Sequence, residues 1–175
     1  GCEIKMIREC TERDLTTILE IIKDAAQAYK GVIPEDCWNE PYMPSDELRH
    51  EIEDGVEFWG LEQDGQLLGI MGIQDKGNLA LIRHAYVRTN AQSEGIGTRL
   101  FWHLEDITEK HLLIGTWAAA SWAISFYEKK GYTSVSEEEK DRLLGKYWSI
   151  SERQIETSVV LADQRWQEAQ RTNPS

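Results

Sequence analysis

The residues with the clearest chemical potential lie in a glycine-containing turn, Gln92 to Gly97, with the sequence QSEGIG. A half-apolar run typical of a strand, Leu79 to Val87, precedes it, and apolar residues at helical spacing follow from Leu100. A turn between a strand and a helix leaves several backbone N–H groups unpaired at the helix start, where the helix dipole adds positive potential. The turn therefore offers an anion cradle, best suited to a pyrophosphate.

Two common phosphate-binding patterns do not fit this turn. A dinucleotide fingerprint needs a third glycine, and Leu100 stands in its place. A P-loop needs lysine and then serine or threonine after its last glycine, whereas Gly97 is followed by Thr98 and Arg99. Two glycines around an isoleucine mostly mark ordinary turns, so the surrounding elements must decide the matter.

The elements that would position the turn can be predicted from periodicity and turn signals. Strands are expected at residues 4–8, 56–63, 66–74, 79–87, 112–117, 132–135 and 154–161. Helices are expected from Thr11 to Gly31, from 45 to 52, from 98 to 109, from 122 to 130, and from Ser136 to just before Gly145. The order is therefore β-α-α-β-β-β-α-β-α-β-α-β, followed by a polar, helix-prone tail from residue 164.

The turn and its neighbours resemble a known family. Gln92 to Gly97 resembles the Q/R-x-x-G-x-G/A acyl-CoA loop of the GNAT N-acetyltransferase superfamily, and Ala85 to Arg88 is similar to the end of its central strand. Ser125 to Tyr132 (SFYEKKGY) resembles the family's A-x-x-(F/L)-Y-(E)-K-x-G-(F/Y) segment. The predicted element order is also similar to the GNAT order from Ile4 to about Leu161.

The resemblance implies an α/β fold with a central, mostly antiparallel sheet of about seven strands and helices on both faces. One domain would cover residues 1–175, with a core at about 4–161 and the polar tail at 164–175. The strands on either side of the glycine-loop helix would splay apart, and acyl-CoA would enter the gap.

The same resemblance implies the site residues. Acetyl-CoA would be the co-substrate, without a metal, and a primary amine would attack it directly in a ternary complex. Tyr127 occupies the position of the family's general acid, and the backbone N–H of Val87 would stabilise the oxyanion. The cofactor would be bound by Tyr86, Val87, Gln92, Glu94, Gly95, Ile96, Gly97 and Thr98, with Arg88 and Arg99 as nearby positive charge.

Two departures from the family pattern bear on catalysis. Ala120 stands where the family often has asparagine, and Leu113 to Trp117 contains no carboxylate where the family often has a glutamate base. His84 is the remaining candidate base; the alternatives are a hydrogen-bonded structural histidine, or a water relay from Glu57 or another carboxylate. These departures motivate a second hypothesis, a non-catalytic acyl-CoA-binding or sensing module, and a third, an interaction protein that uses the fold as a scaffold.

Aromatic residues suggest where an acceptor could bind. Trp38 and Tyr42 lie on a proline-punctuated loop and, with Trp117, could form a pocket wall for an apolar or planar amine. Packing on the core is the alternative for each of them. The amine could be an antibiotic, a polyamine, an amino acid or a protein N-terminus.

Composition narrows the partners and the compartment. The 175 residues have a net charge of −12, which argues against a nucleic-acid partner and favours a cationic one, such as a small-molecule or peptide amine. No apolar run approaches the ~20 residues of a membrane span, and no secretory signal is visible. Cys2, Cys10 and Cys37 have no metal-ligand spacing and suggest free thiols in a reducing cytoplasm. We therefore expect a cytoplasmic enzyme with no membrane partner; a homodimer stays open.

Overall fold

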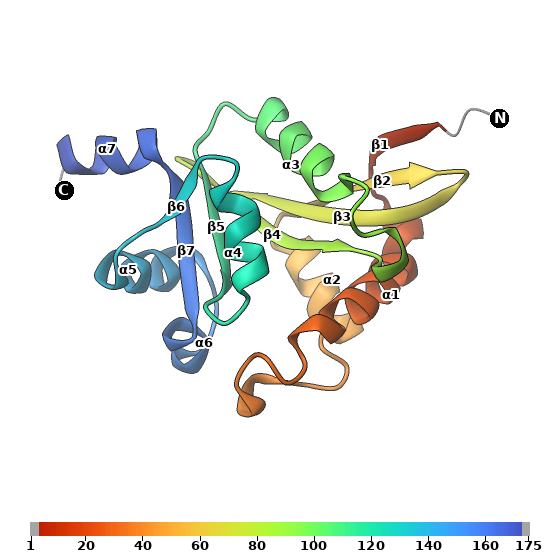
Figure 1. The fold of residues 1–175 in the computed structure, drawn as a ribbon, viewed down its shortest axis with the longest axis horizontal. Coiled ribbons are helices and arrows are strands. Elements are labelled where there is room, and N and C mark those ends of the chain that lie inside the picture. Colours follow the sequence, from red (N-terminus) through yellow and green to blue (C-terminus); the bar gives the residue numbers. More distant parts are fainter. Residues whose placement is uncertain (1–3, 173–175) are drawn as a thin grey trace. The chain divides into compact units, whose positions relative to one another are not determined.

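The computed structural model describes residues 4–172, in which seven strands form one sheet in the order β1-β2-β3-β4-β5-β7-β6 (Figure 1). The strands are β1 (Lys5–Glu9), β2 (Val56–Gln63), β3 (Gln66–Asp75), β4 (Ala80–Val87), β5 (Leu112–Trp117), β6 (Tyr132–Ser134) and β7 (Ser158–Asp163). The pairs β1–β2, β2–β3, β5–β7 and β6–β7 are antiparallel. The predicted fold class is therefore confirmed.

Seven α-helices occur in the described residues: α1 (Leu15–Ala25), α2 (Ser45–Glu53), α3 (Ile96–Ile107), α4 (Ser121–Glu128), α5 (Glu137–Tyr147), α6 (Glu152–Glu156) and α7 (Gln164–Thr172). Short 3₁₀ turns lie at Glu12–Asp14, Ala26–Tyr29, Glu35–Cys37 and Thr89–Ala91. Among these helices of residues 4–172, none has the length and apolar character that crossing a membrane requires.

The chain forms two compact units. The first comprises the residues up to Ala28 together with Asn39–Asp75 and Ile82–Glu109. The second comprises Tyr29–Trp38, Lys76–Leu81 and the residues from Lys110 onward. Strand β4 begins in the second unit and continues in the first. That the whole chain acts as a single domain stays a prediction.

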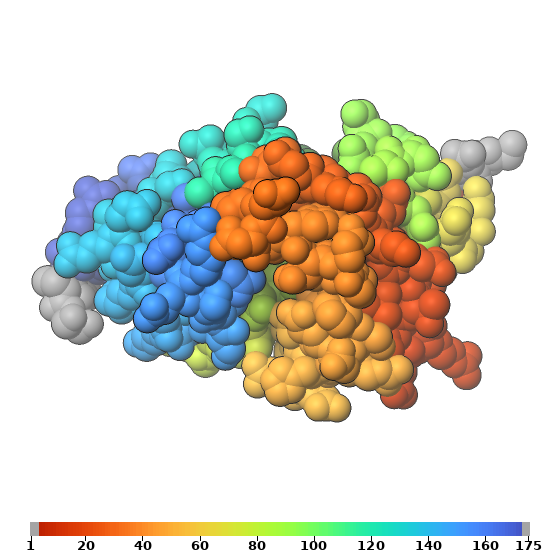
Figure 2. Space-filling view, turned by 90° about the horizontal axis from the view of Figure 1, so that it is seen from below, coloured from red at the N-terminus to blue at the C-terminus, as the bar shows by residue number. Residues whose placement is uncertain are grey.

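In the first unit, α1 and α2 cover one face of the strands and α3 covers the other (Figure 1). Figure 2 shows α1 in red and α2 in light orange side by side on their face. Each helix turns an apolar stripe to the strands because its large apolar residues recur at helical spacing. The fully buried members include Ile18, Ile21 and Ile22 of α1 and Ile96, Leu100, Phe101 and Leu104 of α3.

Two glycines of β3 allow close packing on opposite faces of the strand. A Cβ atom on Gly69 would lie 2.9 Å from a methyl group of Ile96 and 3.2 Å from one of Val87. A Cβ atom on Gly72 would lie 3.3 Å from the ring of Phe58. Residues three apart in a strand face opposite sides. The space left by the missing side chain of Gly69 is therefore filled by the start of α3, and the space at Gly72 adjoins the aromatic ring of Phe58.

The second unit has a core of its own. Leu79, just before β4, packs with Leu81 of β4, Leu113 of β5, Val160 of β7 and residues of α5 and α7. Helix α7 is anchored by Trp166, which is 6% exposed and whose backbone N–H donates to the Asp163 carboxylate at 2.7 Å. The polar tail is therefore a packed helix as far as Thr172.

The structure corrects four local predictions. Helix α3 begins at Ile96 rather than Thr98, and α4 begins at Ser121 rather than at residue 122. Helix α5 continues through Gly145, whose φ is not positive, so that glycine does not end it. Residues expected to begin the last strand, including Ile155, form α6, because Ser151 caps a helix there with its side chain.

The cysteines of the described residues are free thiols, as predicted. Burial is the main cause that raises the pKa of Cys10 to about 12, so this thiol is not a ready nucleophile. Cys37 is 9% exposed. Cys2 lies outside the described residues.

Candidate functional site

The predicted anion cradle is the connection from β4 to α3, within the first unit. Ser93 (φ 71°) and Gly95 (φ 76°) both have left-handed backbone conformations, and Gly95 is the N-cap of α3. The N–H of Arg99 bonds to the carbonyl of Gly95 at 3.1 Å. The N–H groups of Ile96, Gly97 and Thr98 are therefore those that a helix start leaves without an intrahelical acceptor. They combine with the dipole of a 12-residue helix to favour an anion.

Contacts at both ends hold this loop in place. The N–H and hydroxyl groups of Thr89 both donate to the carboxylate of Asp24 on α1, at 2.8 and 3.0 Å. Arg88 bonds to carbonyl groups of β3 twice, through its backbone N–H at 2.8 Å and its Nε at 2.7 Å. Glu94 pairs with Lys5 at 3.4 Å. Arg88, expected near the phosphates, is thus engaged with β3 through its Nε, whereas Arg99 is exposed.

The strand end that leads into the loop is packed against β3. Tyr86 is 8% exposed and Val87 is half-buried, and a methyl group of Val87 lies over Gly69. Because Ile96 lies over the same glycine, the last residue of β4 and the first of α3 meet there. The structure therefore brings together the residues predicted to hold the two ends of the cofactor arm.

His84 lies in the middle of β4 with a φ of 58°, a left-handed conformation that is unusual for a non-glycine residue within a strand. Its Nε2 atom lies 2.9 Å and 2.8 Å from the two carboxylate oxygens of Glu51 on α2. The guanidinium of Arg83 also contacts this carboxylate. The three side chains are only 13 to 16% exposed. His84 is therefore hydrogen-bonded, as one of the alternatives expected.

The electrostatics of this cluster keep the carboxylate ionised. Burial of Glu51 raises its pKa, but the hydrogen bond from His84 and the charges of His84 and Arg83 outweigh burial, and the pKa of Glu51 is lowered. Arg83 also donates to Gln74 Oε1 at 2.9 Å, and Gln74 in turn donates to Asp54. Sequence reasoning missed Glu51, since only folding brings α2 to β4.

Tyr127, the predicted general acid, lies in α4 of the second unit and is 4% exposed. Its ring meets that of Phe126 edge to face, with the centroids 5.0 Å apart. Burial, and next the nearby Tyr29, raises the pKa of the Tyr127 hydroxyl. The hydroxyl thus keeps its proton at neutral pH.

In the second unit, an indole ring covers one residue of β5. Gly115 lies under the indole ring of Trp148, and a Cβ atom there would be 3.1 Å from the ring. A glutamate side chain at this position would have to displace the indole. Ala120, in the place of the family's asparagine, is fully buried before α4.

The three aromatic residues predicted to line a substrate pocket divide between the units. Trp38 is half-buried, with the ammonium of Lys30 6.0 Å from its ring centroid, and Trp117 is 8% exposed; both belong to the second unit. Tyr42 belongs to the first unit and is half-buried. Their substrate role stays a prediction.

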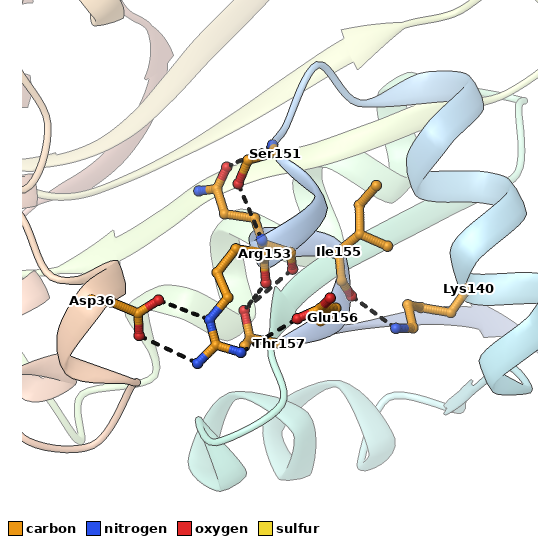
Figure 3. A network of polar contacts seen from close by, with 8 residues as sticks. Asp36, Lys140, Ser151, Arg153, Ile155, Glu156 and Thr157 are labelled. Atoms are coloured by element: carbon orange, nitrogen blue, oxygen red, sulfur yellow. Dashed lines mark hydrogen bonds and ion pairs between the residues drawn. The ribbon is translucent and has the colours of Figure 1, made fainter.

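An ion pair attaches the loop of Trp38 to α6 (Figure 3). The carboxylate of Asp36 accepts hydrogen bonds from Nε of Arg153 at 2.8 Å and from Nη2 of Arg153 at 3.3 Å. Figure 3 also shows Lys140 bonded to the carbonyl of Ile155, at 2.8 Å. Asp36 and Arg153 thus join two segments of the second unit that are far apart in the sequence.

A cavity of about 510 Å³ opens in the first unit between the ends of α1 and α2. Its apolar wall includes Leu15, Ile18 and Phe58, and its charged rim includes Glu57, named above as a relay candidate. None of the residues predicted to bind acetyl-CoA or to catalyse transfer lines it. Phe58 also stacks on His84, with ring centroids 6.0 Å apart.

The family model described as "Acetyltransferase (GNAT) domain" matches residues 20–144. This match covers more than half of the chain and includes the glycine loop and Tyr127. No curated protein matches the sequence significantly.

Many solved structures share the fold. The PaiA N-acetyltransferase from Thermoplasma acidophilum, in complex with coenzyme A, has 20% identity and a TM-score of 0.70 over 91% of this chain and 98% of its own. The ribosomal-protein-S18-alanine N-acetyltransferase from Escherichia coli has 18% identity and a TM-score of 0.65, covering 91% and 93%. The N-acetylglutamate synthase from Neisseria gonorrhoeae, complexed with coenzyme A and N-acetyl-glutamate, has 19% identity and a TM-score of 0.62, covering 93% and 35%.

Proposed function

The chain belongs to the GNAT acetyltransferase family, and from this premise we propose that it transfers an acetyl group from acetyl-CoA to a primary amine. The observation that supports the proposal is the start of α3, where Gly95 is left-handed and the N–H groups of Ile96, Gly97 and Thr98 begin the helix, as an anion cradle would require. Two of the fold relatives were crystallised with coenzyme A, which supports it as the carrier.

The cofactor would extend from this cradle along the end of β4. The N–H groups from Glu94 to Thr98 would bind the pyrophosphate, with Gln92 alongside, because backbone can approach phosphates closely where glycines lack a Cβ atom. Tyr86 and Val87 would pair with the pantetheine arm in the manner of a strand. The N–H of Val87 would then stabilise the tetrahedral oxyanion.

Transfer would proceed by direct attack. The neutral amine forms a C–N bond with the thioester carbon, and the C–S bond then breaks. Tyr127, whose hydroxyl is protonated at neutral pH, donates a proton to the leaving thiolate. We propose this sequence without a metal.

The acceptor would be a small-molecule or peptide amine. A net charge of −12 attracts cations over long distances, which supports an ammonium-bearing substrate. Trp38, Tyr42 and Trp117 would contribute apolar contacts. The S18-alanine N-acetyltransferase among the fold relatives acts, by its name, on an alanine of a ribosomal protein, so peptide amines belong in the first substrate panel.

Two observations favour a second candidate, a non-catalytic acyl-CoA-binding or sensing module. Ala120 stands where the family often has an asparagine, and Leu113 to Trp117 of β5 contains no carboxylate where the family often has a glutamate base. Such a module would bind acetyl-CoA but would not turn it over.

Calorimetric titration with acetyl-CoA, followed by a panel of amines with thiol release monitored, separates these candidates. Binding with thiol release on one amine supports the enzyme, and binding without release supports the module. Gly97→Val should abolish binding because a branched side chain would occupy the phosphate position, and normal binding by this variant would refute the loop assignment. Tyr127→Phe should bind acetyl-CoA normally yet lower turnover; an unchanged rate would remove Tyr127 from the acid role.

A further inference from the structure

We propose that Glu51 is the positioning residue of a carboxylate–imidazole pair, in which it orients His84 so that Nδ1 of the imidazole takes the proton of the acceptor amine. This proposal deepens the proposed N-acetyltransfer and rests on it. The observation that carries it is the direct contact between the Glu51 carboxylate on α2 and Nε2 of His84 on β4.

Packing fixes the orientation of the imidazole. The ring of Phe58 lies 6.0 Å from it at an interplanar angle of 27°, and the ring of Tyr86 lies 6.4 Å from it at 21°. Gly72 of β3 lies beside this cluster, because a Cβ atom there would be 2.7 Å from the backbone oxygen of Arg83 and 3.3 Å from the ring of Phe58. Leu48, fully buried, anchors the turn of α2 that carries Glu51. The imidazole therefore has little freedom to rotate away from the carboxylate.

The charge of Glu51 decides the tautomer of His84. An ionised carboxylate can only accept hydrogen bonds, so the hydrogen must lie on Nε2. Arg83 contacts the same carboxylate and helps to keep it ionised. In the neutral imidazole, Nδ1 then carries the lone pair and is the atom that can accept a proton.

The surrounding charges stabilise the imidazolium that would form. Helix α2 contributes Glu51 and Glu47, and Glu47 interacts electrostatically with both His84 and Arg83. Strand β4 contributes Arg83, whereas β3 and β2 contribute the neutral side chains of Gln74 and Phe58. The Glu51 carboxylate, in direct contact with the ring, would balance the positive charge of the imidazolium that forms when the proton is transferred.

The proton balance of the reaction gives the pair a defined task. An ammonium group loses two protons when it becomes an amide. The first passes to Nδ1 of His84, and from there to solvent, which frees the nitrogen lone pair for attack on the thioester carbon. The second passes from the nitrogen to solvent after the C–N bond forms. The departing thiolate takes its proton from Tyr127, which then recovers one from solvent.

The first test needs no variant. Nitrogen NMR of the wild-type protein, with ¹⁵N-labelled histidine, should show the neutral ring of His84 with hydrogen on Nε2 and a lone pair on Nδ1. The opposite tautomer would overturn the pair, whether or not the protein proves to be an enzyme.

The second test uses Glu51→Gln, with Glu53→Gln as a matched control that removes a charge from an exposed position of the same helix. In Glu51→Gln we expect kcat to fall about 10-fold or more, KM for acetyl-CoA to stay constant, and the midpoint of the acidic limb of the pH–rate profile to move about one pH unit lower. Glu53→Gln should match the wild type. A lower melting temperature for Glu51→Gln with an unchanged pH–rate profile would overturn the proposal.

A double variant checks that Glu51 acts through His84. In a His84→Ala background, Glu51→Gln should cause no further loss of kcat, and an additional 10-fold loss would overturn the positioning role. Absence of thiol release from the wild-type protein with every amine would instead refute the proposed function and, with it, the proton transfer. The NMR result would still decide the pair itself, so the two failures are distinguishable.

Discussion

Replacing Gly69 with alanine tests how closely the acyl-CoA loop depends on β3. The added Cβ atom would lie 2.9 Å from a methyl group of Ile96 and 3.2 Å from one of Val87. Both neighbours are β-branched, and branched side chains have few alternative rotamers. Restoring an ordinary contact of 3.4 Å would move the Ile96 methyl group by about 0.5 Å.

The magnitude follows from this displacement. Overpacking of a well-packed position costs about 1 to 3 kcal/mol of stability. Ile96 is the first residue of α3, so its shift would also disturb the N–H groups that we propose bind the pyrophosphate. Loss of one charge-assisted hydrogen bond costs roughly 1.5 to 3 kcal/mol, so acetyl-CoA should bind at least about 10-fold more weakly.

Urea denaturation and calorimetric titration measure the two effects, and two other glycines serve as controls. Gly72→Ala faces the opposite side of β3, where the Cβ atom would meet a backbone oxygen at 2.7 Å; it should lose stability but keep acetyl-CoA affinity. Gly145→Ala meets nothing within 4 Å in the interior of α5 and should gain roughly 0.5 to 1 kcal/mol. Wild-type stability and affinity in Gly69→Ala would refute this reasoning.

Three further predictions concern stability. The hydrogen bond from Arg8 is the main cause that lowers the pKa of Asp14 to about 2. The contribution of this carboxylate to folding stability is therefore fully present above about pH 4 and is lost as the pH falls through 2. Asp14→Asn should cost about 2 kcal/mol at pH 7, and a difference in melting temperature that persists at pH 2 would contradict this. Gly115→Val should displace the indole of Trp148 and cost about 1 to 3 kcal/mol in urea denaturation, but less in a Trp148→Ala background; equal costs would show that the ring is not the obstacle. Ser136→Ala should cost about 1 kcal/mol in thermal melting, because its hydroxyl caps α5, and an unchanged melting temperature would mean that water replaces the cap.

Local signals in the sequence were sufficient for most elements. Asp64 and Gly65 both have positive φ, as a tight hairpin requires, and β2 and β3 begin and end within one residue of the prediction. The glycine loop was also recognisable, because Gly95 needs a conformation that side chains disfavour. Such signals depend on a few neighbouring residues, so the sequence displays them directly.

The errors arose where one local signal outweighed another. Gly145 was taken to end a helix, but a glycine ends a helix only when it adopts the left-handed conformation, and here it does not. Ile155 follows a β-branched pattern, yet Ser151 and Gln154 form a capping box three residues apart that starts a helix instead. That capping box was visible in the sequence and would have corrected the assignment.

The candidate base could not be resolved from the sequence. His84 was identified, but its partner Glu51 lies on a helix 33 positions earlier, and that distance is closed only by the fold. The face on which His84 lies was also uncertain, because strand alternation does not foresee a residue with φ of 58°. Trp148 over Gly115 is another contact of this kind, which a scan for carboxylates in β5 does not reveal.

Gly69 and Gly72 determine the register of β3 on both of its faces at once. If β3 shifted its register by two residues in either direction, large side chains would occupy the positions of Gly69 and Gly72. Ile96 and Phe58 would then both lose their packing against β3. The start of α3 and the imidazole of His84 thus take their positions along the first unit from the same strand, about three residues or 10 Å apart. The spacing between the proposed cofactor cradle and the proposed base is therefore a property of the sheet, and lengthening the loop between Val87 and Gly95 would leave it unchanged.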